Sequence, residues 1–143
     1  MAGLLEMGSH FYDSTYTAYL ATAQERTGAI GDAFETIGQA LRVNPEEIYY
    51  RPEIFRLRGE LRLKLGPTEL AEADFREAIA LAQKMGAKAW ELRTTMSLAR
   101  LLASERRRDE AHTMLAESYG WFTEGFDTAD LKDAKALLDE LGE

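Results

Sequence analysis

The chain has 143 residues, of which 45% are hydrophobic and 29% charged, so it suits one folded domain with a sizeable core. Its net charge of −8 argues against nucleic-acid binding, which needs a basic patch, and the absence of cysteine excludes disulfides and thiolate metal sites. It has neither an apolar run of membrane-spanning length nor a secretory leader, so we expect a cytoplasmic protein without membrane contact.

The first third of the chain is predicted to form two helices. Residues 1–8 contain Leu4 and Leu5 and resemble the tail of a preceding helix, which would make the chain a fragment of a longer protein. A helix is expected over residues 9–27, with Ser9 as its N-cap and Gly28 as its stop, and a second over residues 30–43. The predicted buried positions are Tyr12, Tyr16, Tyr19, Leu20 and Ala23, then Ala33, Ile37, Ala40 and Leu41.

The centre of the chain is predicted to form a helical hairpin. Residues 44–47 (Asn-Pro-Glu-Glu) have the composition of a helix start, but Pro52 disfavours helix at Arg51, so only a short turn is expected there. Residues 52–85 then form two helices that fold back at Gly66 and Pro67, and Gly86 ends the second. Their apolar stripes are Ile54, Leu57, Leu61 and Leu65, then Leu70, Phe75, Ile79 and Ala82.

The last part of the chain is predicted to form a third hairpin and a final helix. The hairpin consists of helices at residues 89–104 and 108–118, joined by a turn at residues 105–107. Residues 119–126 are expected to be a loop, and Asp127 or Thr128 to cap a helix that ends at Leu141. The apolar positions of this helix are Leu131, Ala134, Leu137, Leu138 and Leu141.

Each predicted hairpin contains the same spacing of small and large residues. A small residue is followed after twelve positions by alanine, after four more by a bulky apolar residue, and after three more by a small one. The three sets are Ala21, Ala33, Ile37, Ala40; Gly59, Ala71, Phe75, Ala78; and Ala99, Ala111, Leu115, Ser118. The corresponding alanines are 38 and 40 residues apart, and such a period is typical of stacked helical hairpins.

This spacing, with Phe55 four residues before Gly59, resembles the tetratricopeptide repeat (TPR), whose period is about 34 residues. The sequence departs from that family at Arg58 and Arg62, where leucine and tyrosine are usual, and it lacks the terminal proline. The resemblance implies an all-α fold, an α-α superhelix (TPR-like solenoid) of about three helical hairpins plus a C-terminal capping helix. We expect a single TPR-like domain over residues 1–143, with repeats at about 9–43, 52–86 and 89–118, a loop at 119–126 and a capping helix at 128–141. A plain helical bundle is the alternative.

A narrower resemblance covers about residues 9–141, and residues 121–131 (WFTEGFDTADL) are its most specific part. The chain is similar to the C-terminal array of large bacterial signalling proteins, in which a class III nucleotide cyclase or DNA-binding domain precedes a STAND-type, AAA-like ATPase. None of the cyclase or ATPase motifs occurs in these residues. The resemblance therefore implies a sensor or scaffold role and no activity of this segment.

Residues suited to catalysis are sparse. The histidines are His10 and His112, and no zinc-binding, phosphate-binding or nucleophile motif occurs, so we expect no enzyme activity, cofactor or metal. The carboxylates near the helix starts and the arginines at 106–108 are expected to be solvated; the acidic residues are Glu69, Glu72, Asp74, Glu77, Asp130, Asp133, Asp139 and Glu140. Four large aromatics are expected in the core, although Trp121 and Phe122 would alternatively contact a neighbouring domain; the four are Trp90, Trp121, Phe122 and Phe126.

A partner is expected in the groove that the first helix of each hairpin lines. The predicted groove residues are Glu53, Arg56, Glu60, Lys64, Arg93, Met96 and Arg100. The three arginines would form a basic strip for a carboxylate or an acidic peptide, unless they pair with internal acids such as Glu60 and Glu91. The Lys and Asn positions with which some tetratricopeptide domains bind a chaperone C-terminus are not matched in this sequence.

The expected function is therefore protein–protein interaction. The chain would recognise a protein or peptide through its groove or the end of the array, and it would contact adjacent domains of a longer chain. Two alternatives stay open: binding of a small anionic ligand by the arginines, and self-association as a homodimer through the N-terminal end, where Leu4, Leu5, Tyr12 and Tyr16 occur.

Overall fold

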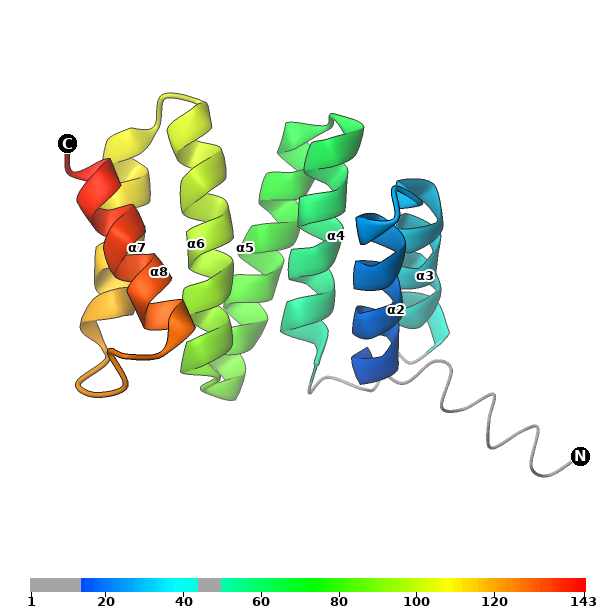
Figure 1. Cartoon of the computed structure of the whole chain (residues 1–143), viewed down its shortest axis with the longest axis horizontal. Coiled ribbons are helices and arrows are strands. Elements are labelled where there is room, and N and C mark those ends of the chain that lie inside the picture. Colours follow the sequence, from blue (N-terminus) through cyan, green and yellow to red (C-terminus); the bar gives the residue numbers. More distant parts are fainter. Residues whose placement is uncertain (1–13, 44–49) are drawn as a thin grey trace, which may run out of the picture. The chain divides into compact units, whose positions relative to one another are not determined.

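The computed structural model describes residues 14–43 and 50–143, which form seven helices and no strand (Figure 1). The all-helical fold predicted from the sequence is therefore confirmed for these residues. The helices are α2 (Ser14–Arg26), α3 (Ile30–Val43), α4 (Arg51–Leu65), α5 (Thr68–Met85), α6 (Lys88–Ser104), α7 (Arg108–Gly120) and α8 (Ala129–Leu141). Within the described ranges, none of the helices is long and apolar enough to cross a membrane.

The chain divides into two compact units, Met1–Asp74 and Phe75–Glu143, with the boundary inside α5. In the first unit α2, α3 and α4 each pack against the other two, and in the second unit α6, α7 and α8 do the same (Figure 1). Neighbouring helices thus bury their apolar faces against one another inside each unit. The single domain and the superhelical stacking of its repeats stay predictions.

Glycine and proline lie at the helix boundaries close to the predicted positions. Gly66 ends α4 with a φ of 117°, in the left-handed region that strains other residues, and its N–H donates to the carbonyl oxygen of Arg62 at 2.8 Å. The predicted exclusion of Arg51 from helix is wrong, because α4 begins at Arg51. Pro52 lies in the first helical turn, where its missing N–H would have no helical acceptor. The Ser9 cap, the apolar residues of 1–13 and the turn at 44–47 lie outside the described residues.

The C-terminal part differs from the prediction in two details. α7 continues to Gly120, so Tyr119 and Gly120 are helical and do not belong to the loop. Thr128 precedes α8 at the N-cap position, but its hydroxyl donates to the carbonyl oxygen of Gly125 at 2.8 Å and forms no cap hydrogen bond.

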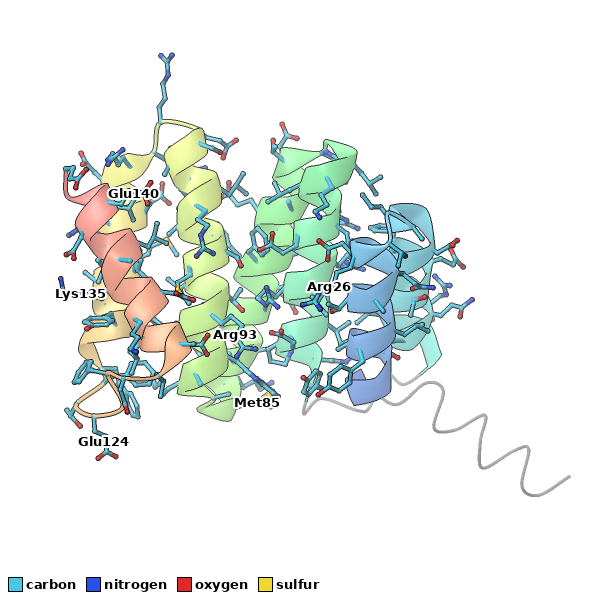
Figure 2. The ribbon with its side chains drawn as sticks, in the orientation of Figure 1. Arg26, Met85, Arg93, Glu124, Lys135 and Glu140 are labelled. Atoms are coloured by element: carbon cyan, nitrogen blue, oxygen red, sulfur yellow. The ribbon has the colours of Figure 1, made fainter. Side chains whose placement is uncertain are left out.

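The last turn of α8 is held by Arg108, which the sequence placed on a solvated turn. Its guanidinium donates to the backbone carbonyl oxygens of Glu140 and Leu141, and Glu140 is labelled at this end of α8 in Figure 2. The last carbonyl oxygens of a helix have no N–H donor inside the helix, so Arg108 supplies one. The helix dipole also favours a cation at this end. Arg108 therefore anchors the C-terminal helix to α7.

The spacing of small and large residues that recurs in the three predicted hairpins, here called the repeat register, predicts burial well. Eleven of its twelve residues are buried, and the exception is Ser118, which is half-buried. Seven of them are 0% exposed, namely Ala33, Ile37, Ala71, Phe75, Ala78, Ala111 and Leu115. The predicted apolar positions of α3 and α8 are likewise buried or half-buried.

Four residues of the predicted apolar helix faces are exposed, and one of them is Ala23 of α2. Leu65 and Leu70 are 53% and 50% exposed, and both lie next to the turn between α4 and α5. Tyr19 is 75% exposed, because the buried face of α2 consists of other residues, namely Thr17, Ala18 and Ala21. The face predicted for α2 is therefore wrong.

A buried ion-pair cluster joins α4 to α5 within the first unit. Asp74, which was predicted to be solvated, is 3% exposed, and its carboxylate lies 2.8 Å from Arg58 Nη2 and 3.3 Å from Arg62 Nη1. The guanidinium carbon of Arg58 lies 5.0 Å from the ring centroid of Phe55, and that of Arg62 lies 5.6 Å from the ring centroid of Phe34. Aromatic faces attract cations, so the two arginines that depart from the TPR pattern are held between rings and a buried carboxylate.

Glu110 of α7 accepts hydrogen bonds from two arginines in the second unit. Arg107 donates through Nε at 2.9 Å and Nη2 at 3.2 Å, and Arg76 of α5 donates through Nη2 at 3.1 Å. The pKa of Glu110 is thereby lowered from its ordinary value of 4.5, with the hydrogen bond from Arg107 as the largest cause. A carboxylate with a lowered folded-state pKa stabilises the fold above its unfolded pKa, and this contribution is lost as the pH falls through the folded pKa.

We expect Arg107→Gln to raise the pKa of Glu110 towards its ordinary value, and Arg76→Gln to raise it by less, since the Arg76 hydrogen bond is the smaller cause. A ¹³C NMR titration of the side-chain carboxyl measures both shifts. Arg106→Gln is the control, because Arg106 lies in the same turn and does not contribute to the pKa of Glu110. A Glu110 pKa that is the same in Arg107→Gln and in the parent chain would contradict the assigned hydrogen bonds.

Candidate functional site

A groove lies between α2 and α4 in the first unit. Its larger part has a volume of about 600 Å³. A smaller hollow of about 300 Å³ adjoins it and shares four of its lining residues, Thr22, Arg26, Arg56 and Leu57. Ligand-binding clefts typically have volumes of about 300–1,000 Å³, so the groove is large enough for several side chains of a bound peptide.

Helical spacing places the lining residues on one face of each helix. Residues at offsets of three, four and seven positions share a helix face. On α2 these offsets give Tyr19, Thr22, Ala23 and Arg26, and on α4 they give Glu53, Arg56, Leu57 and Glu60. Each helix therefore presents one continuous stripe of side chains to the groove.

The α4 side of the groove contains an internal ion pair. The carboxylate of Glu53, a residue that is 5% exposed, accepts hydrogen bonds from Arg56 Nε at 2.9 Å and Arg56 Nη2 at 2.6 Å. Arg56 Nη1 also lies 3.9 Å from Glu60 Oε1. Bidentate pairs of this kind fix the geometry of both side chains. The α4 side thus presents a fixed arrangement of charges in which the guanidinium is already engaged.

The α2 side differs, because Arg26 is exposed and makes no ion pair within the described part of the chain. Arg26 lines both parts of the groove, and Figure 2 shows it on the side of α2 that faces α4. Its neighbour Glu25 joins the two helices, since Glu25 Oε1 lies 2.5 Å from Lys64 Nζ. Tyr19 adds an aromatic side chain that is 75% exposed. The groove therefore offers an accessible ring and an accessible cation.

Three of the seven predicted groove residues, Glu53, Arg56 and Glu60, line this groove together. Lys64 is on the same helix, but its ammonium is paired with Glu25 across to α2.

The other three predicted groove residues lie on α6 in the second unit. Met96 is 3% exposed, and Arg100 is exposed. Arg93 is labelled in Figure 2, and its Nη2 lies 3.0 Å from Asp130 Oδ2 at the start of α8. Internal pairing, the alternative left open by the sequence, thus holds for Arg93 and for Arg56. Glu91, an expected partner of the arginines, instead lies 3.3 Å from Lys88 Nζ.

Sequence reasoning missed the rest of the lining, of which Tyr19, Arg26 and Tyr50 have the largest side chains. Tyr19 was assigned to the buried face because it is aromatic, and Arg26 and Tyr50 were not assigned to any site. The spacing from Tyr19 to Arg26 was the available signal, because it matches the spacing from Glu53 to Glu60 on α4.

The aromatic segment after α7 is not part of the core, contrary to the prediction. Trp121 is 58% exposed and Phe126 is 46% exposed, while Phe122 and Trp90 are half-buried. The rings of Trp121 and Phe122 meet edge to face with their centroids 5.1 Å apart. This segment is accessible to a partner in the described structure of the second unit.

Candidate catalytic and metal-binding groups are few in this structure. His112 is exposed on α7, and His10 lies outside the described residues. Across residues 14–43 and 50–143, no group of three His, Cys, Asp or Glu side chains is placed to hold a metal ion. In comparisons with known proteins, no protein-family model and no curated protein matches the chain.

Proposed function

We propose that the chain is a protein–protein interaction module of the TPR-like class, which binds a peptide segment of a partner protein in the groove between α2 and α4. The groove itself is the observation that supports this proposal best. It combines about 600 Å³ of space with an exposed Tyr19 and an Arg26 that makes no ion pair within residues 14–43 and 50–143. Tyr and Arg, together with Trp, are enriched at the energetic centres of protein interfaces.

The repeat architecture is part of the same proposal. The burial of eleven of the twelve register residues supports three equivalent hairpins, and stacked hairpins of this kind present elongated binding surfaces. The place of the module at the C-terminal end of a larger cytoplasmic bacterial signalling protein, as a sensor or scaffold, rests on the sequence resemblance. The self-association alternative involves Leu4, Leu5 and Tyr12, which lie outside the described residues.

The lining indicates the chemistry of the bound segment. Tyr19, Ala18 and Leu57 provide apolar surface for one or two apolar side chains of the peptide. Arg26 is placed to pair with a carboxylate, whereas Arg56 is already bound to Glu53. A small anionic ligand is less well supported, because Arg56 and Arg93 both form internal ion pairs.

Selection of a random peptide library displayed on phage tests the proposal. Peptides selected against the parent chain are expected to bind Tyr19→Ala and Arg26→Glu about tenfold more weakly, since removal of an interface anchor costs more than about 1 kcal/mol. Isothermal titration calorimetry with the synthetic peptides measures the change. Lys132→Glu is the charge-matched control, because Lys132 is exposed on α8 in the second unit.

Both groove variants change exposed side chains, so circular dichroism should show an unchanged helix content. Peptides that bind both variants as tightly as they bind the parent chain would exclude the groove between α2 and α4 as the binding site.

A further inference from the structure

A second, smaller hollow lies in the second unit, beside the exposed indole of Trp121. It has a volume of about 180 Å³ and is lined by residues from α5, α6 and α7. Trp121 directly follows α7 and is 58% exposed. Met114 and Ile79 contribute apolar surface to the same lining. This volume suits one side chain of a partner and is too small for an extended peptide.

The face of the Trp121 ring already attracts a cation from its own chain. Lys88 Nζ lies 5.5 Å from the ring centroid of Trp121, within the range of a cation–π interaction. The same ammonium lies 3.3 Å from Glu91 Oε1, and Gln83 Nε2 donates to Glu91 Oε2 at 3.2 Å. Glu91 therefore neutralises Lys88, and the remaining charge of the hollow is set by its other lining residues.

The other charged group of the lining is a second carboxylate. Glu117 precedes Trp121 by four residues on α7, so the two side chains share a helix face. Glu117 is exposed and makes no ion pair among the residues that the structure describes. The loop after Trp121 adds two further exposed carboxylates, Glu124 (labelled in Figure 2) and Asp127. The segment that carries the indole is thus aromatic and negatively charged.

We propose that this hollow is a docking site for a lysine or arginine side chain, flanked by apolar residues, of a partner protein. The cationic group would pair with Glu117 and lie against the indole of Trp121, while its apolar neighbours would contact Met114 and Ile79. A second copy of this chain fits less well, because each copy has a net charge of −8 and like charges repel. This site is independent of the groove between α2 and α4 and uses a partner of the opposite charge.

The probe is a blocked peptide of alternating lysine and leucine, titrated into the intact chain at low salt. Isothermal titration calorimetry measures its affinity for the parent chain and every variant, and the indole N–H signal of Trp121 in NMR spectra of the parent chain locates the site. We expect Glu117→Gln and Trp121→Ala to weaken binding about threefold to tenfold each, as expected for exposed charge and cation–π contacts. Lys88→Gln is expected to strengthen binding about threefold, because it removes the competing cation and leaves Glu91 available to the peptide.

Matched controls separate this site from other surfaces. Glu140→Gln makes the same change of charge on α8 and is expected to leave the affinity unchanged. Tyr19→Ala removes an exposed aromatic from the first groove and is also expected to leave it unchanged, so failure of this site is distinguishable from failure of the proposed function.

Four results would overturn the proposal. The first is a Trp121 signal that does not change at millimolar peptide, and the second is an equal peptide affinity of Glu117→Gln and Glu140→Gln. The third is tighter binding of a peptide with glutamate in place of lysine, and the fourth is a lower peptide affinity of Lys88→Gln than of the parent chain. Sedimentation that shows self-association abolished by Trp121→Ala would replace the basic partner with a second copy of the chain.

Discussion

Asp74→Ala is expected to lower the free energy of unfolding by about 3–5 kcal/mol, the usual loss when one member of a buried ion pair is removed. Asp74 is 3% exposed and faces both Arg58 and Arg62, which are themselves partly buried. The substitution leaves two cations without their carboxylate inside the first unit. Because alanine has a high helix propensity, the loss reports the side-chain contacts and not the backbone of α5. Thermal unfolding should show a melting temperature about 10 °C lower.

The control for this prediction is on the same helix. Glu77 is an exposed carboxylate of α5, and Glu77→Ala is expected to change stability by no more than about 0.5 kcal/mol. Asp74→Leu combined with Arg58→Met should recover only part of the loss, because an apolar pair often replaces a buried ion pair at little cost but Arg62 still lacks its carboxylate. If Asp74→Ala and Glu77→Ala have equal effects in urea denaturation, the buried cluster does not form.

Asp74 also illustrates why sequence reasoning misplaced a charged residue. In the sequence it stands among Glu69, Glu72 and Glu77, three carboxylates that the structure places at exposed or half-buried positions, and a local pattern does not distinguish them. What distinguishes Asp74 is Arg58, sixteen residues earlier, which reaches it across the hairpin. The signal was nevertheless present, because arginines at positions that a repeat family fills with apolar residues need a buried partner.

The helix boundaries and the register residues were predictable for a different reason. Helix spacing and helix-ending glycines are local properties, so α3 and the turn at Gly66 follow directly from the sequence. Which face of a helix is covered depends on its neighbours. Leu65 and Leu70 continue the apolar stripes to the ends of their helices, where the described structure leaves them half exposed. Tyr19 is also exposed, because its neighbours do not cover it. Since the sequence interpretation placed Tyr19 in the core, the α2 side of the candidate groove was not predicted.

The accessible residues of the groove could be predicted only in part. The TPR resemblance predicted Glu53, Arg56 and Glu60 on one face of α4, and these three residues line the groove between α2 and α4. It did not show that Arg56 is bound by Glu53, because ion pairing depends on side-chain geometry that spacing does not determine. Among the residues that the structure describes, the groove cation without an ion pair is instead Arg26, on α2, whose buried face the sequence interpretation misplaced.

Leu115→Ala is expected to lower the free energy of unfolding by about 2–5 kcal/mol, because it removes buried methyl groups and leaves a cavity. Leu115 is 0% exposed at the bulky position of the third register set, in a helix that packs against both α6 and α8. Ile37 is 0% exposed at the corresponding position of the first set, so Ile37→Ala should lower stability by a similar amount. Equal losses at these two positions would support equivalent hairpins, and urea denaturation of both variants measures them.

Leu70→Ala provides the matched control, since it deletes the same atoms from a side chain that is 50% exposed. Removal of surface-exposed methyl groups leaves no closed cavity, and the expected loss is below about 1 kcal/mol. The comparison tests burial, because the chemical change is the same in Leu115→Ala and Leu70→Ala and both residues are helical. If Leu115→Ala lowers the free energy of unfolding no more than Leu70→Ala does, α7 does not pack through the face that contains Leu115. The repeat register would then have no structural basis in the third hairpin.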